Sequence, residues 1–150
     1  MYNKVGFYFI MKKTSKDLIK LYLKRQTTDK KLAYLLGVLN TYCDLTSKGV
    51  RDVSLFAPYW TSSRHRQYFP IIKNIVQSYD LQIMPHPDLI DKERNKYWVY
   101  YIYTKGDKKK VEQLISLFRM VCENKKKKSL HKKIGKLLGY SQKAIIKKYG

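Results

Sequence analysis

The run of aromatic and branched residues at positions 97–104, YWVYYIYT, constrains the fold of this chain more than any other stretch. Its composition is typical of a β-strand. Because successive side chains of a strand point to opposite faces of the sheet, both faces of this strand are apolar. A strand of this kind lies at the centre of a sheet that has helices on either side. We therefore predict a central strand that is covered twice.

An alternative interpretation leaves one face of this strand open to a ligand. Tyr97, Tyr101 and Tyr103 share a face, and exposed rings of this kind stack on the bases of single-stranded nucleic acid. Basic residues flank the strand in the sequence: Lys92, Arg94, Lys96 and Lys105. The covered strand is the interpretation that we favour, because the apolar run is continuous.

Helical and strand patterns alternate along the rest of the chain. Leucines at helical spacing, at positions 32, 35, 36 and 39, predict a central core helix over residues 30–44. Further helices are expected over residues 14–25, 67–79 and 108–124. Further strands are expected over residues 5–10, 53–56 and 81–84, the last two ended by Pro58 and Pro85. This order predicts an α+β domain with a small, mostly antiparallel sheet packed against helices.

Charge limits the class of partner. Lys and Arg total 32 against 11 acidic residues, which gives a net charge of +21, and residues 105–150 hold 15 of these bases but only 3 acids. So basic a chain is expected to bind a polyanion. Only six of the bases are Arg, and Lys acts as a hydrated point charge, which favours phosphate contact over recognition of bases. Nucleic acid is the predicted partner, and an acidic protein surface is the alternative.

The last quarter of the chain, residues 125–150, joins a run of lysines to two short amphipathic segments. The apolar stripe of the first segment consists of Ile134, Leu137 and Leu138. Gly139 is expected to end this helix in the left-handed conformation. Ser141 is expected to begin the next helix by capping a free N–H group. We predict a helical hairpin with cationic outer faces.

The second segment has a small apolar side that is expected to fold back on the first, formed by Ala144, Ile145 and Tyr149. Over about twenty residues this hairpin resembles helix-turn-helix DNA-binding modules. Gly135, Gly139 and Ile145 match the small residue of the first helix, the glycine of the turn and the branched residue of the second helix. Lys148 departs from the pattern, since the family usually has a core residue there. The resemblance implies that the second helix enters a DNA groove.

Two parts are predicted from charge and from this resemblance: an α+β body over residues 1–124 and a basic, helix-turn-helix-like appendage over residues 125–150. The candidate nucleic-acid contacts of the appendage are Lys125, Lys126, Lys127, Lys128, Lys132, Lys133, Lys136, Ser141, Gln142, Lys143, Lys147 and Lys148. Arg64 and Arg66 are further candidates, in a polar loop expected just before a helix. Binding of double-stranded DNA is the predicted function, and an RNA-binding or ribonucleoprotein component is the alternative.

The segment LAYLLG, at positions 32–37, resembles the opening of the helix that names the LAGLIDADG homing endonucleases. In that family a carboxylate at the end of the helix holds the divalent metal ion that activates water. The matching positions here are Asn40 and Tyr42, and Asp44 lies two residues past the expected place. The resemblance therefore implies a degenerate relative, and metal-dependent cleavage of DNA is a third hypothesis. A relative that binds DNA without cleaving it is favoured, because the carboxylate is missing.

No cofactor, metal or membrane is predicted as a partner. The chain has no glycine-rich phosphate loop, and His65, His86 and His131 are isolated in the sequence, so we interpret them as surface or loop residues. Cys43 and Cys122 are far apart and are expected to be reduced core residues of an intracellular protein. No stretch approaches the roughly 18 consecutive apolar residues of a spanning helix, and we identify no signal peptide at the N-terminus.

Overall fold

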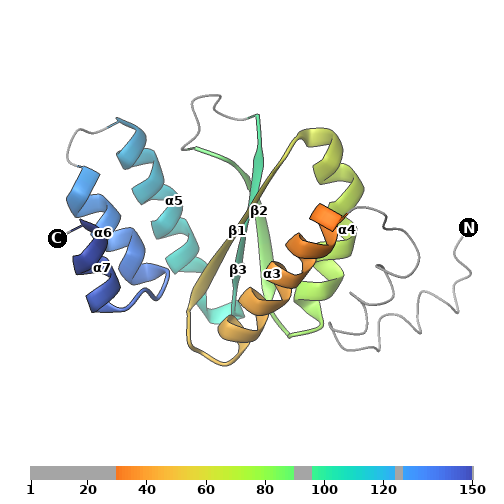
Figure 1. The fold of residues 1–150 in the computed structure, drawn as a ribbon, viewed down its shortest axis with the longest axis horizontal. Coiled ribbons are helices and arrows are strands. Elements are labelled where there is room, and N and C mark those ends of the chain that lie inside the picture. The colour runs from red at the N-terminus through yellow and green to blue at the C-terminus, as the bar shows by residue number, and fades with distance from the viewer. Residues whose placement is uncertain (1–29, 90–95, 124–126, 150) are drawn as a thin grey trace, which may run out of the picture.

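The computed structural model describes residues 30–89, 96–123 and 127–149, in which helices pack on both faces of a small sheet (Figure 1). The helices are α3 (Lys30–Ser47), α4 (Ser62–Gln77), α5 (Lys108–Glu123), α6 (Lys127–Leu137) and α7 (Gln142–Tyr149), with the short 3-10 helix η1 (Lys105–Asp107) before α5. The strands are β1 (Val53–Trp60), β2 (Gln82–Pro87) and β3 (Trp98–Tyr103). The predicted α+β class with a small antiparallel sheet is confirmed. The strand expected over residues 5–10 and the helix expected over residues 14–25 lie outside the described residues.

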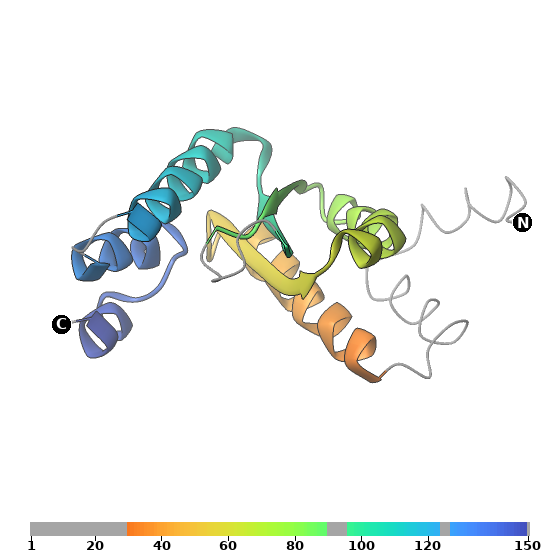
Figure 2. The same cartoon turned by 90° about the horizontal axis from the view of Figure 1, so that it is seen from above.

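The sheet has the order β1-β3-β2, and both pairings are antiparallel. On one face of β3, Tyr100 and Ile102 are fully buried in a core that includes residues of α3 and α4. On the other face, Val99, Tyr101 and Tyr103 belong to a second core built largely by α5 and α6. Seen from above, α3 and α4 lie on one side of the sheet and α5 on the other (Figure 2). The prediction of a central strand covered twice is therefore confirmed.

The two outer strands continue past the prolines at which they were expected to end. β1 continues through Pro58 to Trp60, and β2 continues through Pro85 and Pro87. The expectation that these prolines end the strands was wrong, because both strands are at the edges of the sheet. An edge strand tolerates proline, since its outward side has no neighbour that needs an N–H donor. β1 also contains an irregularity between Phe56 and Trp60, which accommodates Pro58.

Helix α4 begins earlier than its apolar pattern predicted. The polar loop that the sequence predicted before this helix was wrong, because residues 62–66 form the first turns of α4. Pro70 lies inside the helix. Contacts with β3 hold these turns: the indole of Trp98 donates a hydrogen bond to Ser62 Oγ (3.2 Å), and the ring of His65 stacks on that of Trp98. The helix therefore starts where the sheet supports it, although the local sequence is polar.

The junction of α3 and β1 is a closely packed part of the core. Thr46 Oγ1 and Ser54 Oγ lie 2.8 Å apart, and both residues are buried.

The two cysteines differ in their burial. Cys43, a residue of α3, is completely buried in the core, and burial raises the pKa of its thiol to about 12. Cys122 is partly buried, and both cysteines are free thiols. Cys43 is therefore protonated and unreactive at neutral pH.

Candidate nucleic-acid interface

The turn between α6 and α7 has the geometry that the sequence predicted for it. Gly139 has a φ of +75°, which confirms the left-handed conformation. Its N–H group donates to the carbonyl of Lys136 (3.1 Å), and the N–H group of Tyr140 donates to the carbonyl of Gly135 (2.9 Å). These two hydrogen bonds form a Schellman motif, which satisfies carbonyl groups at the end of α6. The motif fixes the direction in which the chain leaves this helix.

Ser141 caps the start of α7, as predicted. The N–H group of Ala144 donates to Ser141 Oγ (3.2 Å), and the N–H group of Ile145 donates to the carbonyl of Ser141 (3.0 Å). A cap of this kind satisfies one of the free donors at a helix N-terminus. Because the Schellman motif at Gly139 fixes the end of α6 and Ser141 caps the start of α7, the connection between the two helices has little conformational freedom.

Gly135 lies where α6 and α7 cross. A Cβ atom at this position would lie 3.3 Å from side-chain carbons of both Tyr140 and Ile145, so glycine allows the close approach. Ile145 is buried, as expected. Ala144, which was expected on the same apolar side, is exposed. It lies about 100° around the helix from Ile145, and this turns it away from α6.

On its other side, α6 packs against the rest of the molecule. Leu130, Ile134 and Leu138 are buried in the same apolar cluster as Val111 and Leu114 of α5. Burial of several such side chains contributes substantially to stability, at about 1.5–3 kcal/mol each. The predicted boundary between residues 124 and 125 stays a prediction. Because α6 shares a core with α5, point substitutions are a cleaner test of the hairpin than its deletion.

A cation joins the turn of the hairpin to the loop between α3 and β1. The guanidinium carbon of Arg51 lies 5.6 Å from the ring centre of Tyr42 and 5.8 Å from that of Tyr140. A Cβ atom on Gly139 would lie 3.1 Å from Arg51 Cγ, so the turn and the loop are in close contact. Cation–π contacts of this kind contribute about 0.5–1 kcal/mol at exposed sites. The hairpin is therefore held at its turn as well as along α6.

The outer faces of α6 and α7 are cationic. Among the predicted contacts of the hairpin, the exposed ones that the structure describes are Lys128, Lys132, Lys133, Lys136, Ser141, Gln142, Lys143 and Lys147. A groove of about 240 Å³ between the two helices is lined by Lys132, Lys133, Lys136, Gln142, Ile145 and Ile146. Residues 127–149 include no acidic residue, so the charged side chains of this segment are all cationic. Ile146 is 56% exposed beside these lysines, although it is a large apolar residue.

Four predicted contacts are described incompletely or not at all. Lys125 and Lys126 lie outside the described residues. Lys127 and Lys148 lie within α6 and α7. The structure thus brings together the eight exposed residues of the hairpin named above.

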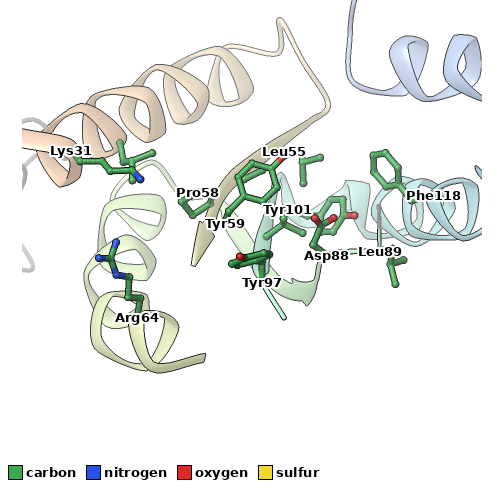
Figure 3. Close-up of a pocket in the computed structure, with 13 residues that line it drawn as sticks. Lys31, Leu55, Pro58, Tyr59, Arg64, Asp88, Leu89, Tyr97, Tyr101 and Phe118 are labelled. Atoms are coloured by element: carbon green, nitrogen blue, oxygen red, sulfur yellow. The ribbon is translucent and has the colours of Figure 1, made fainter. Parts of the chain in front are cut away.

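Arg64 and Arg66 do not belong to this surface. Both are exposed on the first turns of α4, at the end of the molecule away from α7 in both views (Figures 1 and 2). Arg64 instead lines a hollow of about 660 Å³ with Lys31 of α3 and with Tyr59, at the end of β1 (Figure 3). Sequence analysis missed Lys31 and Tyr59 as site residues. The irregular register of β1, which places Tyr59 in this hollow, has no signal in the local sequence.

His65 makes several contacts with residues of the sheet. Its Nδ1 atom lies 2.8 Å from the hydroxyl of Tyr100, and its ring stacks on Trp98 with centroids 4.3 Å apart. Partial burial, and secondarily the positive charge of Arg66, lower the pKa of His65 below its usual 6.5. His65 therefore lies in α4 and not in a loop, and it is partly buried by these contacts. Among the residues that the structure describes, no group of three or more His, Cys, Asp or Glu side chains could hold a metal ion.

The positions that carry the homing-endonuclease resemblance have structural partners. The hydroxyl of Tyr79 donates to Asn40 Oδ1, and Tyr42 lies beneath Arg51. Asp44 accepts a hydrogen bond from Lys48 Nζ (3.0 Å) one turn further along the chain. These contacts give each of the three side chains a place in the packing of α3.

Fold and surface together define an α+β protein with a basic helical hairpin packed against its core. Comparison of the chain with protein-family models, with curated proteins and with solved structures found no match. Within the described ranges, every helix is too short or too polar to cross a lipid bilayer.

Proposed function

We propose that the protein binds double-stranded DNA, with α7 in the major groove and the lysines of α6 on the phosphate backbone. The observation that carries the proposal is a rigidly connected pair of helices whose outer faces hold exposed lysines and no acidic residue. A helix that is fixed by its cap and by the core can enter a groove without a large loss of conformational entropy. The hairpin has both supports.

The size and the exposed face of α7 fit a DNA groove. Its 8 residues form a short helix. An α-helix with its side chains is about 10–12 Å in diameter, and the major groove is about 12 Å wide. Gln142, Lys143 and Ile146 are exposed on one side of α7, together with Lys147. Gln suits adenine, Lys suits guanine, and an apolar side chain suits the methyl group of thymine. The exposure of Ile146 supports an apolar contact in the complex.

The lysines supply affinity that depends on salt. Each lysine that neutralises a phosphate releases condensed counterions, so the slope of log affinity against log salt changes by about −0.9 for each contact. Lysines suit this role because a flexible ammonium group contacts phosphate as a point charge. The exposed lysines of both helices can contact the two walls of one groove.

Double-stranded RNA is the less suitable partner. The major groove of an A-form helix is deep and narrow, and side chains on a protein helix do not reach its base edges. A helix such as α7 therefore has no equivalent place on duplex RNA. Weaker binding to duplex RNA than to duplex DNA at equal salt would support the proposal, whereas a preference for RNA would support a ribonucleoprotein component.

The double substitution Lys143→Gln/Lys147→Gln tests the contact of α7 with DNA. If each lysine contacts one phosphate, the two together contribute about a thirty-fold increase in affinity at 0.15 M salt relative to 1 M salt, and about nine-fold at 0.3 M. The variant should therefore lose about thirty-fold at the lower concentration and about nine-fold at the higher, with a salt slope smaller by about 2. Fluorescence anisotropy with a labelled duplex measures both values.

Lys30→Gln/Lys73→Gln is the matched control, with the same change of charge. Lys30 is exposed at the start of α3 and Lys73 is exposed on α4, and both elements lie there at the end of the molecule away from α7 (Figure 1). The control should keep nearly the affinity and the salt slope of the wild type. An equal loss in the two variants would show that net charge alone determines binding, and the hairpin would not be the site.

A further inference from the structure

The hollow at the end of the sheet is a second candidate site, separate from the hairpin. It has a volume of about 660 Å³, within the range of about 300–1,000 Å³ that is usual for small-molecule sites. Its walls include Leu55 and Val99, so its floor is the apolar face of β1 and β3. Aromatic rings and charged groups also line the hollow. Such a combination of apolar walls and few polar groups is typical of a binding pocket.

Tyr59 lies in this hollow in a strained backbone conformation. Its φ is +55°, and it follows Pro58 in the irregular part of β1. Left-handed conformations are uncommon for residues other than glycine, and they concentrate at functional sites. The side chain of Tyr59 is 56% exposed, so packing of the core does not explain why a bulky residue is held there. A bulge that aims an exposed ring into a hollow indicates a ligand contact.

The rings and the charges of the hollow lie in a definite order (Figure 3). Tyr59 and Tyr97 meet edge to face, with centroids 6.2 Å apart and planes at 89°. Lys31 and Arg64 lie on one side of these two rings in the view of Figure 3, and both are exposed. The open mouth of the hollow is therefore cationic next to an aromatic wall.

A carboxylate lies on the other side of the two rings. Asp88 lines the hollow and is only 7% exposed, and its N–H group donates to the carbonyl of Tyr97 (2.8 Å). Burial, and secondarily the charge of Asp88, raise the pKa of Tyr101. Tyr101 therefore stays neutral, and its hydroxyl remains a donor or an acceptor near this carboxylate. A carboxyl group has two oxygen atoms, and each can accept more than one N–H group.

We propose that the hollow binds one unpaired guanine nucleotide, with its base against Tyr59 and Tyr97, its amino edge toward Asp88 and its phosphate toward Arg64 and Lys31. Guanine presents two adjacent N–H donors, which match the two oxygens of a carboxylate. Stacking on tyrosine suits any base, so Asp88 provides the preference among bases. The nucleotide is either free or part of a single strand, and both sources share this chemistry. The site goes beyond the proposed hairpin function and does not depend on it.

Binding is measured with the full chain and three ligands: guanosine monophosphate, a labelled oligothymidine, and the same oligonucleotide with one central guanine. At about 0.3 M salt the contribution of exposed lysines is smaller than at about 0.15 M, and it is the same for the two oligonucleotides. The wild type is expected to bind the guanine-containing strand at least about tenfold more tightly than oligothymidine. Tyr59→Gly should remove most of this difference, because without the ring no base is held beside Asp88. Its thermal midpoint should stay the same or rise, because glycine adopts the positive φ without strain.

Asp88→Asn should bring the two oligonucleotides to equal affinity, and Arg64→Gln should weaken both. Lys73→Gln is the control for charge, and it should change neither. Binding of guanosine monophosphate alone identifies a site for the free nucleotide, and binding of the strand alone identifies a site for nucleic acid. Equal affinities for both strands in the wild type, with no binding of the mononucleotide, overturn the proposal. Should Asp88→Asn not fold, Tyr59→Gly and Arg64→Gln still decide the outcome.

These experiments test the two proposed sites independently. Lys143→Gln/Lys147→Gln should keep the preference for guanine in single strands, and Tyr59→Gly should keep the affinity for duplex DNA. A loss of duplex binding in Tyr59→Gly, with its thermal midpoint intact, contradicts the separation of the two sites. The hollow and the hairpin are therefore tested by different variants and different ligands.

Discussion

Replacing Gly139 with alanine tests the turn of the hairpin, and Gly37→Ala is its matched control. Gly139 has a φ of +75°, and a new Cβ atom there would lie 3.1 Å from Arg51 Cγ. The left-handed conformation costs an L-residue about 1–2 kcal/mol, and the close contact adds to this. Gly37 lies inside α3 with nothing within 4 Å of a new Cβ atom, so alanine gains about 1 kcal/mol of helix propensity there. The two variants should differ by about 2–3 kcal/mol in the free energy of unfolding.

Thermal unfolding followed by the fluorescence of Trp60 and Trp98 measures this difference. For a chain of 150 residues, 1 kcal/mol corresponds to about 2–4 °C in the thermal midpoint. The midpoint of Gly139→Ala should fall by about 2–8 °C, and that of Gly37→Ala should rise by about 2–4 °C. A Gly139→Ala variant at least as stable as the wild type would refute the reasoning, because a left-handed turn in contact with Arg51 cannot accept a side chain without cost.

Two further predictions concern the body of the protein. Thr46→Val should destabilise the fold by about 1–3 kcal/mol, because it leaves the buried hydroxyl of Ser54 without its partner. The double variant Thr46→Val/Ser54→Ala should be closer in stability to the wild type. If urea unfolding shows that the losses of the two single substitutions simply add, the two side chains do not interact directly. The pKa of His65 is lowered in the folded chain, so protonation of this residue favours the unfolded state. Its contribution to the free energy of unfolding is therefore complete above about pH 6.5 and declines below that pH. His65→Gln should therefore show a smaller loss of thermal midpoint between about pH 7.5 and about pH 5.5 than the wild type, and equal losses would exclude His65 as the titrating group.

The central strand and its covering helices could be predicted because their signals are local. The continuous run over residues 97–104 contains its own evidence for burial on both faces, and the leucines of α3 recur at the period of a helix. The limits of β1 and β2 could not be predicted, because a proline is tolerated only if its strand is at an edge, and strand order is a tertiary property. The start of α4 was missed for a similar reason, since Trp98 and Tyr100 support it from β3.

The same distinction separates the two sites. Gly139 and Ser141 define the hairpin through hydrogen bonds to residues at most five positions away, so the turn and the cap were predictable from the sequence. The hollow takes Lys31 from α3, Arg64 from α4 and Asp88 from the segment after β2, and their meeting depends on the whole fold. A strained tyrosine has no local signature that distinguishes it from a core tyrosine.

The prolines of β1 and β2 also affect how molecules meet in solution. Each outer strand of the described sheet carries at least one residue without an N–H donor: Pro58 in one, Pro85 and Pro87 in the other. A strand from a neighbouring molecule would lack part of the hydrogen-bond ladder on either edge, and proteins limit aggregation by this means. The described sheet is thereby protected against lateral growth, which helps so aromatic a chain to remain dispersed at high concentration.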